Sequence, residues 1–270
     1  MLPEQPIGIF DSGVGGLTVA AEVFRQLPEE RIIYFGDTAH VPYGSKKVEE
    51  LKTYADQIVG FLIARGAKAI IDACNTTSAV ALPFLRQKYS LPIVGVIEPG
   101  VEEAVKASRN KRIGVIATEA TVASEAHKKA SKTMAPESQV FLQACPRLVP
   151  LIEGGKVSGE EVKQAVEEYL APLLAEGIDT LILGCTHYPF LEPLIREIVG
   201  PGLKLIDPAA ATVRKLREIL AKAGALCRGH GSKTHDFFVS GDPQAFSRVG
   251  KALTGWDFLI GTQKVDLVEE

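Results

Sequence analysis

The sequence has few cysteines and lacks the spacings in which cysteines usually form disulfide frameworks or bind metal. Four occur among 270 residues: Cys74, Cys145, Cys185 and Cys227. None belongs to a CxxC pair, which argues against zinc-finger and thioredoxin-like sites. A chain of this length buries about three quarters of its unfolded surface, so its core needs neither disulfides nor a structural metal. We therefore expect free thiols and no metal.

Three other features are lacking: an excess of charge of one sign, a long apolar run and a secretory leader. Lys and Arg number 30 against 33 Asp and Glu, so no overall field attracts nucleic acid or anionic lipid. No apolar run approaches the roughly 20 residues of a membrane span. Residues 1–6 have neither a basic region nor a long apolar core. We expect a cytoplasmic protein with reduced thiols that binds neither nucleic acid nor membrane.

Short apolar runs are abundant and alternate with amphipathic stretches. Hydrophobic residues make up 46% of the chain, as in ordinary globular proteins. Near-continuous apolar runs are typical of parallel strands covered on both faces, and their alternation with helices predicts βαβ units. The predicted strands are 7–10, 31–35, 69–71, 93–97, 113–116, 140–142, 181–183, 204–206 and 237–239. The predicted fold class is α/β with mostly parallel sheets.

Two of the predicted helices have recognisable ends. One has a capping box formed by Ser158 and Glu161, which predicts a start at Ser158, and it stops at Gly177. The other begins near Ser45 and stops at Gly66. Both carry apolar residues at a spacing of three or four, which is typical of a helix with one buried face.

The two halves of the chain resemble each other. Residues 7–12 resemble 113–118, and residues 73–76 resemble 184–187, with similar offsets of 106 and 111. Any one match between short apolar strands is weak, but a cysteine at matched positions favours duplication of a unit of roughly 100 residues.

The duplication predicts a division of the chain. We expect two similar open parallel-sheet α/β domains related by a pseudo-two-fold axis, with the active site in the cleft between them. The first unit spans residues 1–98 and the second 99–207. The segment 208–270 has no partner repeat, and we expect it to pack back onto the first unit.

Polar residues follow the ends of several predicted strands, namely Asp11, Asp37, Cys74, Thr118 and Cys185. In open parallel sheets the ligand crevice lies at the carboxyl ends of the strands, so these side chains should converge there.

Cys74 and Cys185 each stand between a predicted strand and a helix start, where free N–H groups stabilise a thiolate. A single free cysteine is more often a buried hydrophobe. Two of them, flanked by Asn75, Thr76, Thr186 and His187, favour function. His187 could donate or accept a proton, or fill a turn. Cys145 and Cys227 lack such neighbours, and we predict structural roles for them.

Three carboxylates could orient or tune these groups: Asp11, Asp37 and Glu153. Each could equally cap a helix or contact solvent in a loop, and for Asp37 and Glu153 taken alone that reading is favoured. The glycine-rich turn at 13–16 lacks the last glycine of GxGxxG but could offer N–H groups to an anion. Cys227, His230 and His235 include metal-ligand types in what we predict to be a loop, with metal binding a remote alternative.

Six segments resemble the bacterial glutamate racemases, which belong to the aspartate/glutamate racemase superfamily. They are residues 8–16, 36–38 with 41–44, 73–76, 95–100, 151–154 and 184–189. The resemblance implies a cofactor-independent interconversion of L- and D-glutamate that supplies D-glutamate for peptidoglycan, and it implies a homodimer.

The resemblance also implies roles for individual residues. Cys74 and Cys185 match the two acid–base thiols on opposite faces of the substrate α-carbon, with Asp11 supporting Cys74 and His187 supporting Cys185. Asp37 and Glu153 match assisting positions. Residues that match substrate-binding positions are Asp11, Ser12, Pro42, Tyr43, Gly44, Asn75, Thr76, Thr118, Thr121, Thr186 and His187. His40 departs from the family pattern, in which a basic residue, often Arg, is expected, and this changes the electrostatics of the loop.

Three alternatives remain open from the sequence. The chain could be an aspartate or other amino-acid racemase of the same superfamily. It could be a non-catalytic two-lobed protein that binds an amino acid. It could also be a Cys–His hydrolase with Cys185 as nucleophile, which leaves Cys74 without a role.

Overall fold

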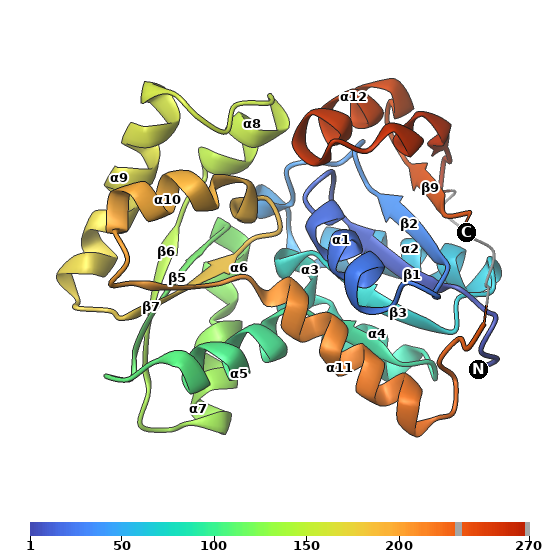
Figure 1. The fold of residues 1–270 in the computed structure, drawn as a ribbon, viewed down its shortest axis with the longest axis horizontal. Coiled ribbons are helices and arrows are strands. Elements are labelled where there is room, and N and C mark those ends of the chain that lie inside the picture. The colour runs from blue at the N-terminus through green and yellow to red at the C-terminus, as the bar shows by residue number, and fades with distance from the viewer. Residues whose placement is uncertain (230–233, 268–270) are drawn as a thin grey trace.

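The computed structural model describes residues 1–229 and 234–267 and contains two parallel β-sheets (Figure 1). We call the part of the chain built on the larger sheet the first lobe and the part built on the smaller sheet the second lobe. In spatial order, the larger sheet consists of β10 (Gln263–Lys264), β9 (Asp236–Val239), β2 (Ile32–Gly36), β1 (Ile7–Asp11), β3 (Ala69–Asp72) and β4 (Ile93–Gly95). The smaller sheet consists of β6 (Gln139–Ala144), β5 (Arg112–Ala117), β7 (Thr180–Gly184) and β8 (Lys204–Ile206).

Every strand pair in these two sheets is parallel. The strands are buried along most of their length, except that β6 is only partly buried and β10 is exposed. Apolar residues flank both faces of each sheet, which is why the sequence shows continuous apolar runs rather than alternation. The predicted α/β class with two open parallel sheets is confirmed.

Helices cover both faces of the sheets. In the first lobe they are α1 (Leu17–Gln26), α2 (Val48–Ala64), α3 (Asn75–Val80), α4 (Leu82–Lys88), α11 (Pro208–Lys222) and α12 (Pro243–Thr254). In the second they are α5 (Ile97–Ala107), α6 (Glu119–Ser124), α7 (Ala126–Met134), α8 (Leu148–Glu153), α9 (Glu160–Ala175) and α10 (Glu192–Val199). Among the helices of residues 1–229 and 234–267, none has the length and apolar character to cross a membrane.

The C-terminal part of the chain returns to the first lobe. After β8, helix α11 runs back from the second lobe (Figure 1), and β9 then pairs with β2 in the larger sheet, between β2 and the edge strand β10. The first and the last strand of the described chain, β1 and β10, therefore both belong to the first lobe. The expected boundary after residue 98 falls in the first turn of α5, and the one after residue 207 falls at the start of α11.

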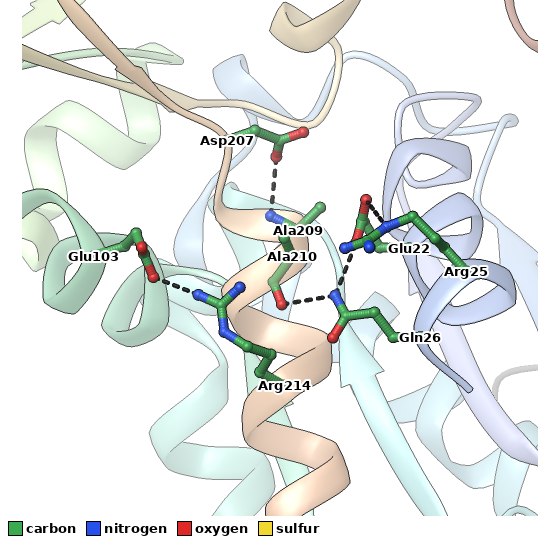
Figure 2. Close-up of polar contacts among 8 residues, drawn as sticks. All are labelled: Glu22, Arg25, Gln26, Glu103, Asp207, Ala209, Ala210 and Arg214. Carbon is green, nitrogen blue, oxygen red and sulfur yellow. Dashed lines mark hydrogen bonds and ion pairs between the residues drawn. The ribbon is translucent and has the colours of Figure 1, made fainter. Parts of the chain in front are cut away.

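Helix α11 connects the lobes through both packing and polar contacts. It packs on α1 of the first lobe and α5 of the second. Figure 2 shows Arg214 paired with Glu103 of α5, and the Gln26 side chain of α1 donating to the carbonyl of Ala210 at 3.0 Å. Asp207 caps the helix by accepting from the N–H of Ala209. Helix α11 thus contacts both lobes.

Three details of the sequence prediction were wrong. The strand expected at 93–97 ends at Gly95, because Ile97 already begins α5. The helix expected from Ser158 begins at Glu160: Gly159 is the N-cap, with φ +96°, and no side chain caps it. The helix expected near Ser45 begins at Val48, where Lys47 N–H donates to Glu50. The predicted ends at Gly66 and Gly177 are confirmed, and both glycines have positive φ.

A buried ion pair ties the N-terminal segment and the segment that follows α11 to the first lobe. Lys68 Nζ lies 2.6 Å from Glu30 Oε2, and the two side chains are 0% and 2% exposed. Lys68 also donates to the carbonyls of Pro3 and Ala225, and Glu30 Oε1 accepts from the N–H of Cys227. A buried charge is tolerated when it is paired and hydrogen-bonded in this way.

We expect Lys68→Met to lower the free energy of unfolding by about 3–5 kcal/mol, because it leaves the Glu30 carboxylate buried without a partner. The double variant Lys68→Met/Glu30→Gln should lose less. Lys106→Met is the matched control, since Lys106 forms an exposed pair with Glu102, and such pairs contribute about 0–1 kcal/mol. Urea unfolding measures all three. Equal losses for Lys68→Met and Lys106→Met would contradict the prediction.

Candidate active site

A cavity of about 180 Å³ lies between the lobes, at the carboxyl ends of strands from both sheets. Its lining residues are Ser12, Pro42, Tyr43, Gly44, Ser45, Cys74, Asn75, Thr76, Thr118, Glu119, Cys145, Pro146, Val149, Cys185, Thr186 and His187. The substrate-binding residues expected from the sequence therefore line one cavity, except Asp11 and Thr121. Both thiols of the expected pair border the same space, one from each lobe.

Cys74 follows β3 and is the N-cap residue of α3. Its carbonyl accepts from the N–H of Ser78, which closes the first turn of the helix. Burial raises the pKa of the Cys74 thiol well above its usual range, and the charges of Asp11 and Asp72 raise it further. A hydrogen bond from the N–H of Thr77 opposes this rise but does not cancel it. The expected stabilisation of the thiolate by the helix start is thus outweighed at Cys74, which is a thiol at neutral pH.

Cys185 follows β7 and begins a chain of polar contacts within the second lobe. Its Sγ lies 3.6 Å from His187 Nδ1, and His187 Nε2 lies 2.7 Å from Glu153 Oε1. Burial lowers the pKa of His187, but hydrogen bonds and charge from Cys185 and Glu153 more than offset it and raise the pKa well above its usual value. Burial likewise raises the pKa of Glu153, and His187 reverses this to a net lowering. Glu153 and His187 therefore form a carboxylate–imidazolium pair beside the Cys185 sulfur.

Asp11 lies at the end of β1 and reaches across to the second lobe. Its Oδ1 accepts from Thr186 Oγ1 at 3.0 Å, and its Oδ2 accepts from the N–H of Gly13 at 3.0 Å. Burial raises the pKa of Asp11, against a lowering by His187 and these hydrogen bonds. The hydrogen bond from Thr186 thus links Asp11 to the Cys185 side, although the charge of Asp11 also acts on Cys74.

The glycine-rich turn after β1 packs against the second lobe. A Cβ added to Gly15 would lie 2.6 Å from His187 Nδ1 and would also overlap Thr186 Oγ1. The N–H groups of this turn bond to carboxylates of the chain itself, Gly13 to Asp11 and Val14 to Glu153. The expected anion-binding turn therefore serves as a contact between the lobes.

The loop after β2 carries Pro42, Tyr43 and Gly44 to the cavity wall. Asp37 is not part of that wall. It accepts hydrogen bonds from the Tyr43 hydroxyl and from Ser240 Oγ, and His40 Nδ1 lies 2.8 Å from its Oδ1. Asp37 therefore anchors the loop from outside the cavity wall, and His40 contacts the Asp37 carboxyl group directly.

Three threonine hydroxyls join the lobes on another side of the cavity. Thr76 of α3 lies 3.0 Å from Thr118, which in turn lies 2.9 Å from Thr121 of α6. Thr121 is fully buried and reaches the cavity through Thr118. The hydroxyls present a small polar surface to any bound ligand.

The sequence analysis missed five lining residues, of which Cys145 is the most notable. It follows β6, so the rule that polar residues at strand ends converge was sufficient to find it. Its neighbour Pro146 offers no acid–base group, so the sequence pattern favoured a structural role for it. Burial raises the pKa of the Cys145 thiol well above its usual range.

In the predicted loop near Cys227, the described residues Cys227 and His235 form hydrogen bonds with other parts of the first lobe. The Cys227 N–H donates to Glu30, and His235 Nδ1 accepts from the N–H of Ile32. His230 lies outside the described residues. Within the described part of the chain, no three His, Cys, Asp or Glu residues are grouped in a way that could hold a metal ion.

Comparisons with known proteins agree with one another. A family model described as Asp/Glu/Hydantoin racemase matches residues 13–216. Glutamate racemase from Desulforudis audaxviator is 52% identical over 255 residues, covering 92% of this chain and 93% of that protein. The chain belongs to the glutamate racemase family.

Solved structures of this family share the fold. The crystal structure of glutamate racemase isoform RacE1 from Bacillus anthracis is 40% identical, with a TM-score of 0.94 over 98% of each chain. Glutamate racemase from Francisella tularensis, solved in complex with D-glutamate, is 37% identical, with a TM-score of 0.89 over 99% of this chain and 98% of that one.

The His187–Glu153 pair can be tested by titration. We expect Glu153→Gln to lower the pKa of His187, because the neutral amide removes the charge that favours the imidazolium. As pH rises, the variant His187 should lose its proton at lower pH than the wild-type residue. Two-dimensional NMR of the imidazole nitrogens measures this. Glu102→Gln, which changes an exposed glutamate, is the control. An unchanged His187 titration in Glu153→Gln would show that the pair is not coupled.

Proposed function

We propose that this protein interconverts L- and D-glutamate by proton transfer at the α-carbon, with Cys74 and Cys185 as the two acid–base groups. The observation that carries the proposal is that two thiols, one from each lobe, border one small cavity. Racemisation requires a base on one face of the carbon and an acid on the other. Membership of the glutamate racemase family supports glutamate as the substrate.

The proton transfers are balanced by an exchange of roles. One cysteine, as thiolate, removes the α-proton, and the other, as thiol, delivers a proton to the opposite face. The product leaves with inverted configuration, and the two sulfurs have exchanged protonation states. The reverse reaction uses them in the opposite order, so both must be able to gain and lose a proton.

The site's charges support this exchange. The imidazolium of His187, held by Glu153, lies beside the Cys185 sulfur and can pass a proton to it or take one back. On the other side, Cys74 is buried, and the negative charge of Asp11 acts on it. Its thiolate is therefore costly, and a substrate ammonium group in the cavity would offset that cost.

The remaining residues are proposed to bind the substrate and hold it still. Hydroxyl and amide groups of Ser12, Asn75, Thr76, Thr118 and Thr186 line the cavity and can hydrogen-bond the two carboxylates of glutamate. Fixed donors in a site that excludes water stabilise the carbanion-like transition state. Asp37 assists by holding Tyr43 at the wall.

We propose the same division of the chain for catalysis. Residues 1–98, with 208–270 packed back onto them, supply Asp11, Asp37 and Cys74, and residues 99–207 supply Glu153, Cys185 and His187. We further propose a cytoplasmic homodimer that supplies D-glutamate for peptidoglycan. Sedimentation equilibrium should give twice the chain mass of 29.0 kDa, whereas a single-chain mass would overturn the dimer.

Replacing either thiol by serine should abolish racemisation in both directions, with a loss of roughly 10²–10⁴-fold or more, because each direction needs both a base and an acid. The measurement is incubation with L-glutamate in D2O, following circular dichroism and deuterium at the α-carbon together. Cys227→Ser is the matched control, since Cys227 lies outside the cavity. Full activity of Cys74→Ser or Cys185→Ser would reject the mechanism.

The same D2O experiment separates the other classes of function. A protein that only binds an amino acid gives tight binding and no deuterium at the α-carbon. A Cys–His hydrolase accumulates an acyl-enzyme on Cys185 and is indifferent to Cys74.

The substrate is tested by comparing L-glutamate with L-aspartate. We expect glutamate to be preferred, because family membership points to it. Aspartate is one methylene shorter, and a single methylene is worth about 10–200-fold in discrimination. Initial rates with both substrates at equal concentrations measure the ratio of glutamate to aspartate turnover. Faster turnover of aspartate would contradict glutamate as the preferred substrate and favour an aspartate racemase.

A further inference from the structure

Asp72 is a fully buried carboxyl group that the proposed mechanism does not use. It ends β3, two residues before Cys74, and its side chain is 0% exposed. Its Oδ1 accepts from Thr77 Oγ1 at 2.5 Å, whereas its Oδ2 has no hydrogen-bond partner among the described residues. A buried charged carboxylate with an unpartnered oxygen is costly, so this arrangement suits the protonated acid.

The contacts of Asp72 hold the turn that positions Cys74. Its side chain binds Thr77, and its backbone carbonyl accepts from Ser78 Oγ at 3.0 Å. Both residues belong to α3, whose first turn is closed by the bond from Ser78 N–H to the Cys74 carbonyl. Thr77 Oγ1 also lies 3.2 Å from that carbonyl. Asp72 is therefore linked to Cys74 by hydrogen bonds through Thr77 and Ser78, which belong to the same turn.

Asp72 also acts on Cys74 electrostatically. The titratable groups whose charges act on Cys74 or respond to it come from several elements: Asp11 of β1, Tyr34 of β2, Tyr43 of the following loop, Asp72 of β3 and Cys185 after β7. Asp11 and Asp72 are the carboxyl groups of this set. Burial raises the pKa of Asp72 to about 8, against the hydrogen bond from Thr77 that lowers it, and the charge of Asp11 raises it further. Asp72 is thus neutral at pH 7 and becomes charged above pH 8.

We propose that Asp72 is a positioning residue for Cys74, a neutral carboxyl group that fixes the first turn of α3 and, by remaining uncharged, lets Cys74 form a thiolate. The inference deepens the two-thiol mechanism proposed above and rests on it for its functional meaning. The ionised form of Asp72 keeps the turn but opposes the thiolate, so Cys74 becomes a weaker acid at the pH where Asp72 loses its proton. A carboxyl group with a purely structural role would not change the acidity of Cys74 in this way.

The decisive variant is Asp72→Asn, which keeps the shape and the acceptor for Thr77 but cannot ionise. The measurement is the rate at which iodoacetamide alkylates Cys74 between pH 6 and 10, followed by mass spectrometry of the Cys74 peptide, since only the thiolate reacts. We expect alkylation of Cys74 at pH 9 to be about tenfold faster in the variant than in the wild type, because a neighbouring like charge shifts a thiol pKa by about one unit or more. Near pH 6.5, where Asp72 is neutral in both proteins, the rates should agree. Cys227 in the same samples is the internal reference.

A second variant covers the case in which Asp72→Asn does not fold. Thr77→Val removes the hydrogen bond that favours the ionised form of Asp72, so Asp72 stays neutral to higher pH and Cys74 alkylation above pH 8 should again be faster. Near-UV circular dichroism verifies the fold of each variant. Superimposable pH profiles for wild type and the folded variants would overturn the inference.

The kinetic readout separates this inference from the proposed function. We expect Asp72→Asn to keep kcat near pH 7 and to lose less activity above pH 8 than the wild type, in the direction in which Cys74 is the base. Asp72→Ala removes the acceptor as well and should lower kcat at every pH. If the wild-type protein does not racemise glutamate, the proposed function fails, while the alkylation profile still tests the coupling of Asp72 to Cys74.

Discussion

The close approach of the glycine-rich turn to Thr186 and His187 is the contact on which the site depends. It brings the end of β1 against the end of β7, so that strand ends from two separate sheets face one cavity. The hydrogen bond from Thr186 to Asp11 fixes the same approach through side chains. Helix α11, packed on α1 and α5, and the threonines of α3 and α6 hold the lobes together elsewhere. A side chain at Gly15 would disrupt the site by moving the two thiols apart, without altering the reacting groups themselves.

The two thiols have different surroundings, although each follows a parallel strand and borders the same cavity. Cys185 lies beside an imidazolium, which is itself held by Glu153. Cys74 has carboxyl groups for neighbours and no histidine among its described contacts. A reaction that runs in both directions needs the two thiolates to be similar in free energy only when substrate is bound. The ammonium and carboxylate groups of glutamate therefore belong to the electrostatic balance of the site.

Much of the fold and part of the site could be predicted from the sequence. The strands were recognisable because burial on both faces requires continuous apolar runs, and the strand-end rule placed Cys74 and Cys185 at one crevice. The contact between His187 and Glu153 was not derivable from pattern, because the residues are 34 apart and belong to different elements. The helix start at Ser158 was wrong because Gly159 takes the cap and Glu161 pairs with Lys156. Asp72 was overlooked because it reads as the polar end of an apolar strand, and its missing partner is visible only in three dimensions.

The first lobe is made from both ends of the chain, and this has a consequence for its synthesis. Strand β2 remains an open edge of the larger sheet until β9, at residues 236–239, is available to pair with it. All four strands of the smaller sheet precede residue 207 and need nothing from the last sixty residues to pair. On a ribosome, where domains fold as units while the chain emerges, the inserted second lobe can therefore close before the first lobe that began earlier. The exposed edge of β2 is then the site at which an unfinished chain can pair wrongly with another chain.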